Sequence, residues 1–321
     1  MKIKMMYSFL NSDLSIIEES LEKTVTTESP LLFEASTQLI RAGGKRIRPI
    51  FVLLAGKFGD YSKDEIRSVA VALELIHMAS LVHDDVIDDA KLRRGQPTVK
   101  AKWDNRVAMY TGDYIFAQSL ELITREISNP LLHQILAETL VELCLGEIEQ
   151  IKDKYNYNQD VRNYFRRIKR KTAILIAASC QLGAIAAGAS EEIHKKLYRF
   201  GYYVGMSYQI IDDVLDFTQT EKELGKPAGG DLLQGNITLP VLVAMRQDHL
   251  RNEIIKVNEY TTREEIEPLV EKIKVSNAIE ESLRISNLYL DKALAILEQL
   301  PKNQANKAFV QIAKYIGKRK N

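Results

Sequence analysis

The sequence predicts an all-α protein. Long stretches of Leu, Ile and Ala carry charged residues at every third or fourth position, which is the spacing of an amphipathic helix. Only eight prolines interrupt the 321 residues, and no stretch alternates apolar and polar residues as a half-buried strand does. With 45% hydrophobic residues the chain can bury a substantial core. No Pro/Gly/Ser linker and no repeat divides it, so we expect a single domain over residues 1–321.

The expected helices begin with one at about 13–25, for which Ser12 or Asp13 is the expected N-cap. A second helix is expected at 30–41, because proline suits a first turn and Gly43-Gly44 would end the helix. The later helices share the same apolar spacing and are expected at 47–58, 63–88, 104–127, 130–153, 159–188, 190–218, 236–247, 262–274, 277–298 and 303–317.

Composition excludes several classes of protein. The formal net charge is +1, so no overall field favours nucleic acid or a membrane surface. Cys144 and Cys180 stand in apolar helical contexts without metal-ligand spacing, and we expect buried thiols in a reducing cytoplasm. The N-terminus reaches Asn11 before any long apolar run, which argues against a signal peptide. The uncharged stretch 172–190 is rich in Ala, Gly and Ser, so we expect a buried helix and no transmembrane segment.

One acidic segment stands at the end of an apolar helical run. Residues 83–89 have the sequence His-Asp-Asp-Val-Ile-Asp-Asp, and helical geometry puts Asp84 and Asp88 on one side with Asp85 nearby. Carboxylates this close repel one another, and an apolar setting raises the cost. Oxygen ligands with no His or Cys alternating among them suit Mg²⁺, which combines one or two carboxylates with phosphate oxygens. The segment therefore predicts a Mg²⁺ site for a phosphorylated substrate.

Two basic loops supply candidate anion ligands. Residues 43–49 have the sequence Gly-Gly-Lys-Arg-Ile-Arg-Pro, in which glycines allow a close approach and cations stand at a helix start. Arg93 and Arg94 follow the acidic segment, and guanidinium groups match phosphate oxygens. Each loop also has a simpler explanation. The first could be a solvated basic turn, and the two arginines could only neutralise the neighbouring aspartates.

The acidic pattern occurs twice. Asp212, Asp213 and Asp216 repeat the Asp-Asp-x-x-Asp spacing 128 residues after Asp84, again on an apolar helix and again before a basic loop, Gly225-Lys226. Charge runs on a surface are common, whereas two identical carboxylate triplets embedded in Val, Ile and Leu are not. We expect the two acidic walls to face each other and to hold divalent ions on one diphosphate.

Together these motifs resemble those of the trans-isoprenyl diphosphate synthases, the polyprenyl synthetases. Five match in the family's order: 43–49, Asp84–Asp88 with 93–95, Lys171-Thr172, Gln209 with Asp212–Asp216, and Gly225-Lys226. The resemblance covers nearly the whole chain and is closest to the large catalytic component of two-component synthases of the heptaprenyl type. It implies a single-domain orthogonal helical bundle around a deep central cavity, and Mg²⁺ as the cofactor.

The resemblance also implies a role for each motif. Asp84, Asp88 and Asp212 would bind the metal ions that bridge an allylic diphosphate such as farnesyl diphosphate, with Asp85, Asp213 and Asp216 in support. Substrate ligands are implied in two groups: Arg93, Lys171 and Lys226 for the allylic diphosphate, and Lys45, Arg48, His77 and Arg94 for isopentenyl diphosphate. Thr172 and Gln209 would stabilise the allylic cation, and no side chain is assigned as general base. Without the resemblance, His77 would be interpreted as a core histidine.

Small side chains before Asp84 bear on product length. Ala79 and Ser80 stand where short-chain members of the family carry bulky aromatics that stop chain growth, and Ile76 lies one turn deeper. We therefore expect a long product of about C30 to C40, with C35 favoured by the resemblance. Such a product would serve as the side chain of a respiratory quinone.

Three alternatives remain open. A di-iron protein would use Glu74-x-x-His77 and Glu191-x-x-His194 but would leave both aspartate triplets unexplained. A non-catalytic partner subunit could lack the aspartates or the basic loops, and none is missing. A terpene cyclase would need neither the second-substrate cations nor a second triplet. The resemblance further implies a small, unrelated partner subunit, or otherwise a homodimer.

Overall fold

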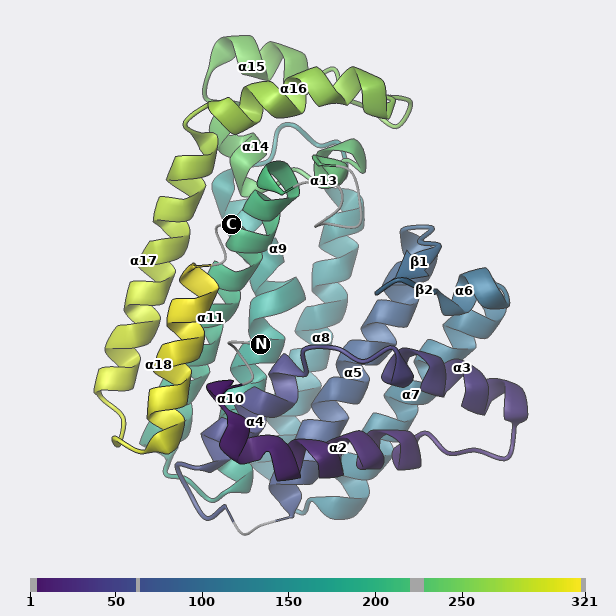
Figure 1. Ribbon diagram of the computed structural model, residues 1–321, viewed down its shortest axis with the longest axis vertical. Coiled ribbons are helices and arrows are strands. Elements are labelled where there is room, and N and C mark those ends of the chain that lie inside the picture. Colours follow the sequence, from purple (N-terminus) through teal and green to yellow (C-terminus); the bar gives the residue numbers. More distant parts are fainter. Residues whose placement is uncertain (1–4, 62–63, 220–227, 319–321) are drawn as a thin grey trace. The chain divides into compact units, whose positions relative to one another are not determined.

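The structure, a computed structural model, describes residues 5–61, 64–219 and 228–318 (Figure 1). Within these ranges it is almost entirely helical, and the prediction of an all-α fold is confirmed. The chain divides into two compact units. Unit 1 comprises Met1–Leu136 and Ser179–Leu197, and unit 2 comprises Ala137–Ala178 and Tyr198–Asn321. The single domain expected over residues 1–321 stays a prediction.

Unit 1 contains the N-terminal elements η1 (Ser8–Leu10), α2 (Asn11–Thr24), α3 (Pro30–Arg41), α4 (Ile47–Gly56), α5 (Glu65–Ile87), β1 (Leu92–Arg93), β2 (Gln96–Pro97), α6 (Val99–Lys102) and α7 (Asn105–Glu126). Three helices contribute residues to both units: α8 (Pro130–Lys152), α10 (Ile174–Ala186) and α11 (Glu191–Thr218). The other elements belong to unit 2: α9 (Val161–Ile168), η2 (Lys169–Ala173), α13 (Gly230–Leu233), α14 (Leu239–Ala244), α15 (Asp248–Ile254), α16 (Arg263–Val275), α17 (Ala278–Glu298) and α18 (Gln304–Gly317). Every helix expected from the sequence has a counterpart among them.

Helix α5 is the central element of unit 1. It packs against α4 and α7, and Figure 1 shows the three side by side. Side chains such as Val69 and Leu73 are fully buried, so α5 is apolar around most of its circumference. Among the described residues it is the one helix whose length and apolarity would suit a membrane span, and 67% of that window is buried inside the protein. The expected buried helix at 172–190 corresponds largely to α10, of which only Gln181 is partly exposed.

Capping side chains explain where several helices begin. Ser29, Asp104 and Asp160 each accept a hydrogen bond from a backbone N–H three residues later, as good N-caps do. The expected N-cap at Ser12 or Asp13 is wrong, because α2 already begins at Asn11 without a side-chain cap. Asp13 instead accepts a hydrogen bond from the hydroxyl of Tyr61 at 2.8 Å.

The helix expected at 159–188 is interrupted near its middle. Helices α9 and α10 are joined by η2, a π-helical turn at Lys169–Ala173. Apolar spacing does not reveal such a turn, because both flanking segments keep the helical period. The short elements β1, β2, α6, α13 and α15 were also not expected, since so few residues carry too little periodicity to recognise.

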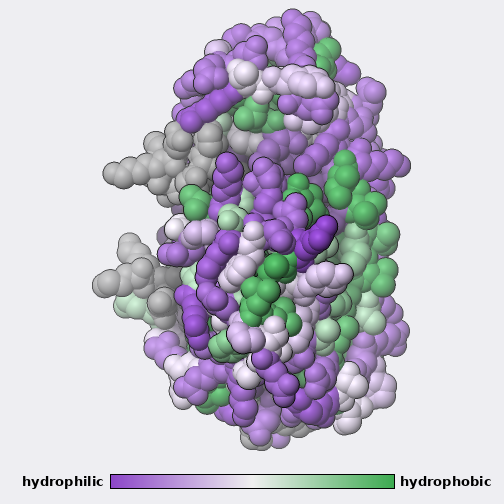
Figure 2. Space-filling model, turned by 90° about the vertical axis from the view of Figure 1, so that its right-hand side faces the viewer, coloured by the Kyte–Doolittle hydropathy of each residue, from purple (hydrophilic) through white to green (hydrophobic). Residues whose placement is uncertain are grey.

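Surface polarity follows the usual pattern for a folded chain. The face in Figure 2 is mainly hydrophilic, with a few hydrophobic groups exposed. Cys180 is buried as expected, but the prediction for Cys144 is wrong because its side chain is exposed on α8. The helical spacing around Cys144 predicts an apolar face, and burial of that face is a separate matter.

Candidate active site

The first aspartate motif lies at the C-terminal end of α5. Ile87 is the last helical residue, and the N–H of Asp88 still donates to the carbonyl of Asp84 at 2.8 Å. The last turn therefore brings Asp84 and Asp88 together, as the helical spacing predicts. A helix C-terminus carries partial negative charge, so carboxylates here are disfavoured both by the helix and by each other. A cation at this point relieves both repulsions.

Asp85 is the buried member of this motif, with 3% of its surface exposed. It accepts a hydrogen bond from Nε of Arg93 at 2.7 Å, and Nη2 of Arg93 lies 2.6 Å from the same carboxylate oxygen in an ion pair. Burial raises the pKa of Asp85, and the ion pair with Arg93 only partly opposes this. In this structure Arg93 thus neutralises a neighbouring aspartate, as the simpler interpretation expects. Lys100 pairs with Asp89 in the same way.

His77 on α5 lies within range of the charges of four arginines. Burial, together with the positive charges of Arg48, Arg94, Arg93 and Arg46, holds the pKa of His77 well below its usual range. His77 is therefore neutral, and of the four arginines Arg46 and Arg93 also form ion pairs with carboxylates. The cations come from two segments far apart in the sequence, the loop 43–49 and the region of β1. Such a convergence of positive charge suits a ligand with several negative charges.

Gly44 and Arg94 bring these two segments into contact. A Cβ at Gly44 would lie 2.8 Å from Nη1 of Arg94, so the guanidinium group would have to shift if another residue replaced the glycine. Arg94 is exposed and has a left-handed backbone with φ of 53°. Its pKa is lowered by desolvation and by the charge of Arg46. Arg48 and Arg94 therefore both act on His77, whereas Lys45 is exposed next to Gly44 and its part in this group stays a prediction.

Arg46 differs from the other cations of the basic loop because it is buried. Its guanidinium forms ion pairs with Glu18 at 2.5 Å and Glu74 at 3.1 Å, and donates to the carbonyl of Ile40 at 3.0 Å. Its backbone is left-handed, with φ of 47°, at the residue before α4. Arg46 thus anchors the loop that carries Lys45. Sequence reasoning missed this role, because the pairing depends on residues 28 positions away on either side.

The di-iron alternative loses its ligands in the structure. Glu74 binds Arg46, and Glu191 forms an ion pair with Lys195. His194 lies 3.4 Å from the amide nitrogen of Gln181. The part of the chain that the structure describes contains no group of three or more His, Cys, Asp or Glu side chains placed to hold a metal ion. In each Glu-x-x-His pair the glutamate is thus already held by a basic side chain, which leaves the di-iron alternative without support from these contacts.

The three residues expected to set chain length lie one to two turns before Asp84 on α5. Ala79 and Ile76 are each 1% exposed and form part of the core. Ser80 is partly exposed, and its hydroxyl donates to the carbonyl of His77 at 2.8 Å. No bulky aromatic side chain occupies these three positions, and their effect on the product stays a prediction.

The position of the first motif against α7 depends on a glycine that sequence reasoning missed. A Cβ at Gly112 would lie 2.3 Å from Nε2 of His83. The same nitrogen lies 3.2 Å from a carboxylate oxygen of Asp113. His83 therefore rests directly on the backbone of α7, and this contact holds the end of α5 that carries Asp84. No spacing in the sequence relates His83 to Gly112.

The second aspartate motif lies in the last turns of α11, in unit 2. Asp212 is exposed, whereas Asp213 is 3% exposed and Asp216 is 1% exposed. Burial raises the pKa of Asp213 to about 8, and the charge of Asp231 adds to the effect. Asp216 accepts a hydrogen bond from the backbone N–H of Asp231 at 3.1 Å. Asp212 is thus the member of the triplet that a solvated ligand can reach.

A chain of hydrogen bonds joins this motif to the Lys171-Thr172 motif. The hydroxyl of Thr172 donates to Oε1 of Gln209 at 2.7 Å, and the amide of Gln209 donates to Asp213 at 2.8 Å. The hydroxyl of Tyr164 donates to the other oxygen of Asp213 at 2.6 Å. Lys171 forms an ion pair with Glu147 at 3.1 Å. The buried Tyr164 is a member that sequence reasoning missed, because nothing in its local sequence distinguishes it from a core tyrosine.

Unit 2 therefore brings together Lys171, Thr172, Gln209 and the second aspartate triplet. Unit 1 brings together the first triplet, through Asp85 and Arg93, with Arg48, His77 and Arg94. Lys226, the remaining predicted ligand, lies outside the described residues. That the two aspartate triplets face each other stays a prediction.

Comparison with known proteins identifies the family. The sequence profile described as polyprenyl synthetase matches residues 29–273. The chain belongs to the polyprenyl synthetase family. The matched range contains every predicted site residue, so the resemblance stated from the five motifs is confirmed and this polyprenyl synthetase is a prenyltransferase.

Individual relatives agree with this assignment. Heptaprenyl diphosphate synthase component 2 of Bacillus subtilis (strain 168) is 65% identical over 320 residues, which is 100% of this synthetase and 92% of that protein. The crystal structure of heptaprenyl diphosphate synthase from Staphylococcus aureus matches with a TM-score of 0.94 and 42% identity, over 97% of this chain and 99% of that chain. Polyprenyl synthase from Caulobacter crescentus CB15, complexed with calcium and isoprenyl diphosphate, matches with a TM-score of 0.92 and 29% identity, over 99% and 98%.

Proposed function

We propose that this polyprenyl synthetase extends an allylic diphosphate such as farnesyl diphosphate with successive isopentenyl diphosphates to a long-chain product, heptaprenyl diphosphate. One observation carries the proposal. A single helix, α5, presents His77 among four arginines and, two turns later, the carboxylates Asp84 and Asp88. The first group suits the diphosphate of isopentenyl diphosphate, and the second suits a metal-bound diphosphate. The names of the Bacillus and Staphylococcus relatives support the seven-unit product.

Mg²⁺ is the cofactor that we propose, with Asp84, Asp88 and Asp212 as its ligands. The fit rests on the donor set, since all three are oxygen donors near helix C-termini and none is fully buried. Bound Mg²⁺ supplies electrostatic stabilisation of the departing diphosphate. The Caulobacter relative, complexed with calcium and isoprenyl diphosphate, supports a divalent cation here, because Ca²⁺ and Mg²⁺ both prefer oxygen ligands.

One group of basic side chains would bind each of the two diphosphate substrates. Lys45, Arg48, His77 and Arg94 would bind isopentenyl diphosphate, and neutral His77 can donate a hydrogen bond without adding to the repulsion among the cations. Arg93, Lys171 and Lys226 would bind the allylic diphosphate. For Arg93 this requires sharing its guanidinium between Asp85 and the substrate, which five N–H donors permit.

The proposed condensation proceeds in three steps, which are ionisation, attack and loss of a proton. The allylic C–O bond breaks, the electron pair leaves with the diphosphate, and the double bond of isopentenyl diphosphate attacks the allylic carbon. The oxygens of Thr172 and Gln209 would stabilise the positive charge, and their mutual hydrogen bond holds them in place. A proton is lost to the released diphosphate. Apolar surroundings that exclude water prevent capture of the cation as an alcohol.

A companion subunit is part of the proposal. The Bacillus relative is named as component 2, which implies a further component of that synthase. In unit 2, α8 exposes Val141, Leu145 and Ile148 at 59%, 43% and 63%, with Cys144 beside them. Their spacing of four and three residues places them on one face of the helix. We propose this face as the contact for a small companion in the cytoplasm, with a second copy of the chain as the other outcome.

The decisive experiment is an elongation assay. Purified protein is incubated with Mg²⁺, farnesyl diphosphate and radiolabelled isopentenyl diphosphate, with and without cell extract, and the dephosphorylated products are separated by chromatography. A C35 product in either condition supports the function, and activity only with extract supports the companion. A variant carrying Asp84→Asn and Asp88→Asn is the matched control and should lose the activity. Absence of elongation by the unmodified protein in both conditions contradicts the proposed function.

A further inference from the structure

The π-helical turn η2 is enclosed by two glycines. A Cβ at Gly146 of α8 would lie 2.7 Å from Cβ of Arg170 and 3.1 Å from the backbone nitrogen of Lys171. On the other side, a Cβ at Gly205 of α11 would lie 2.6 Å from Cα of Ala173. Neither glycine has a left-handed φ, so each is needed for space and not for backbone conformation. The turn that carries Lys171 and Thr172 is therefore in direct backbone contact with two helices.

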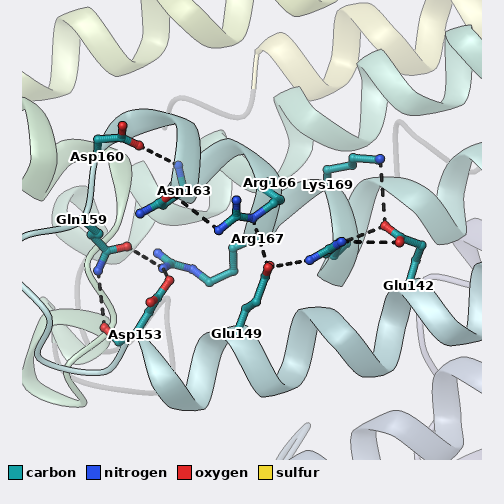
Figure 3. Close-up of polar contacts among 10 residues, drawn as sticks. Glu142, Glu149, Asp153, Gln159, Asp160, Asn163, Arg166, Arg167 and Lys169 are labelled. Atoms are coloured by element: carbon teal, nitrogen blue, oxygen red, sulfur yellow. Dashed lines mark hydrogen bonds and ion pairs between the residues drawn. The ribbon is translucent and has the colours of Figure 1, made fainter.

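Arg170 binds the turn to α8 through two glutamates, one on each side of Gly146. We call Arg170, Glu142 and Glu149 the clasp. Its guanidinium donates from Nε to Glu142 at 3.1 Å and from Nη1 to Glu149 at 2.5 Å. Glu142 precedes Gly146 by four residues and Glu149 follows it by three, so one carboxylate stands on each side of the glycine on one helix face. Arg166 also forms an ion pair with Glu149, at 3.0 Å, and Figure 3 labels Glu142, Glu149 and Arg166. All three members of the clasp are partly buried, which reduces screening by solvent.

Gly205 relates the turn to the predicted catalytic side chains. It lies four residues before Gln209 on α11, so both occupy the same face of that helix. The hydroxyl of Thr172 donates to Oε1 of Gln209 at 2.7 Å, and the next residue, Ala173, is the one that lies against Gly205. Gln209 in turn donates to Asp213, which lies one further turn along. We call the close contacts of η2 with Gly146 and Gly205 the seat of the turn. The contact at Gly205 and the hydrogen-bond chain thus depend on the same separation between η2 and α11.

The π-turn itself decides which side chain faces α11. A π-turn contains one residue more than an α-turn, and one residue corresponds to about 100° of rotation around the helix axis. If η2 relaxed to an α-helical turn, Lys171 and Thr172 would rotate away from their partners relative to α9. An irregular turn of this kind persists where the surrounding structure determines it more strongly than the local sequence does.

We propose that Gly146, Gly205 and Arg170 are positioning residues, which hold the π-turn so that Lys171 and Thr172 face the reacting end of the allylic diphosphate. The inference deepens the proposed function and rests on it. In this proposal the three residues contact neither substrate. They affect the reaction only by fixing the position of η2, which carries Lys171 and Thr172. Their loss should therefore affect the allylic substrate and the chemical step, while the binding of isopentenyl diphosphate, assigned to Lys45 and its neighbours in unit 1, stays unchanged.

Glycine variants test the seat. Gly146→Ala and Gly205→Ala should each lower kcat/KM for farnesyl diphosphate at least about tenfold, since a misplacement of 1 Å can cost about 10²-fold. The KM for isopentenyl diphosphate should stay unchanged. Gly183→Ala is the matched control, because its Cβ would meet the carbonyl oxygen of Val52 at 2.4 Å within unit 1. It should lower thermal stability to a similar degree without this kinetic pattern.

Amide hydrogen exchange supplies a readout that does not depend on activity. Exchange in the peptide 168–174 should become faster in Gly146→Ala and Gly205→Ala than in Gly183→Ala. Arg170→Gln tests the same proposal without steric overlap and serves if the glycine variants do not fold. Arg170→Lys should restore part of the lost kcat/KM, because it keeps one charge but not the two-sided grip.

The outcomes separate the inference from the function on which it rests. If the unmodified protein elongates farnesyl diphosphate but the two seat variants behave like Gly183→Ala, or Arg170→Gln keeps full kcat/KM, the positioning role is wrong and the function stands. If the unmodified protein does not elongate with or without extract, the function fails and the positioning role falls with it.

Discussion

The guanidinium group of Arg94 lies against the backbone of Gly44, where a Cβ would be 2.8 Å from Nη1. This contact joins the loop 43–49 to the segment that follows the first aspartate motif. It places Arg94 among the cations that lower the pKa of His77. The two basic segments of the sequence therefore meet in unit 1 at Gly44 and Arg94, and this contact offers a direct test of the proposed site for isopentenyl diphosphate.

Gly44→Ala should weaken the binding of isopentenyl diphosphate. The added methyl group displaces the guanidinium of Arg94, and we expect KM for isopentenyl diphosphate to rise about tenfold, which corresponds to about 1.4 kcal/mol. The KM for farnesyl diphosphate should change little. Steady-state kinetics with each substrate varied in turn checks this. Gly317→Ala is a control, because its Cβ would meet only the end of the Leu290 side chain. Equal effects on both substrates would contradict the assignment of Arg94.

Replacing Ala79 or Ser80 with Phe should shorten the product. Both residues have small side chains, Ala79 in the core and Ser80 partly exposed next to it on α5. If the growing chain passes these positions, as we propose, an aromatic ring at either one would stop it earlier. Chromatography of the dephosphorylated products measures the length distribution. Total incorporation of label serves as the control for intact chemistry. A distribution identical to that of the unmodified protein would show that these residues do not limit chain growth.

His77 should make the protein less stable in mild acid. Burial and four arginines hold the pKa of His77 far below its usual range, whereas the unfolded chain binds this proton near pH 6.5. Stability therefore falls as the pH drops below about 6.5, by at most about 1.4 kcal/mol per pH unit from this residue. His77→Gln should lose less stability than the unmodified protein between about pH 7 and 5.5 in urea denaturation. Parallel pH profiles would rule out this contribution.

A charged pair on α8 should prevent association with a companion. Leu145→Glu together with Ile148→Glu places two carboxylates on the exposed apolar face without touching the core. We expect loss of any extract-dependent activity and of any complex seen by size-exclusion chromatography, with unchanged thermal stability. Val275→Glu is the matched control, since Val275 is 81% exposed at the end of α16. If the double variant keeps both the complex and the activity, the companion binds elsewhere.

Local spacing determined the helices and the chemistry of the site. The bounds expected for α3, 30–41, agree with the structure. Pro30 marks the first turn and Gly43-Gly44 the end, because both residue types act on the local backbone. The same period showed that Asp84, Asp85 and Asp88 share one end of a helix, and the order of five motifs identified the family. These inferences succeed because the interactions that they use lie within about four residues along the chain.

Only the tertiary structure decided which of these side chains are already paired. Arg46 belongs to the basic loop in sequence, but its side chain is buried and forms ion pairs with Glu18 and Glu74. Asp85 forms an ion pair with Arg93. Cys144 was expected to be buried and is exposed. Each outcome depends on which helix packs against which, and these partners come from distant parts of the chain.

The first aspartate motif shows most clearly which properties depend on the local sequence and which depend on the tertiary structure. The sequence alone determined that carboxylates gather at the end of an apolar helix and need a cation. The tertiary structure decided that Asp85 is buried against Arg93 and that Asp84 and Asp88 remain accessible. In the second motif it also decided that a π-turn, seated on Gly146 and Gly205, brings Thr172 to Gln209. The period of a helix is local, whereas close approach between helices depends on the whole fold.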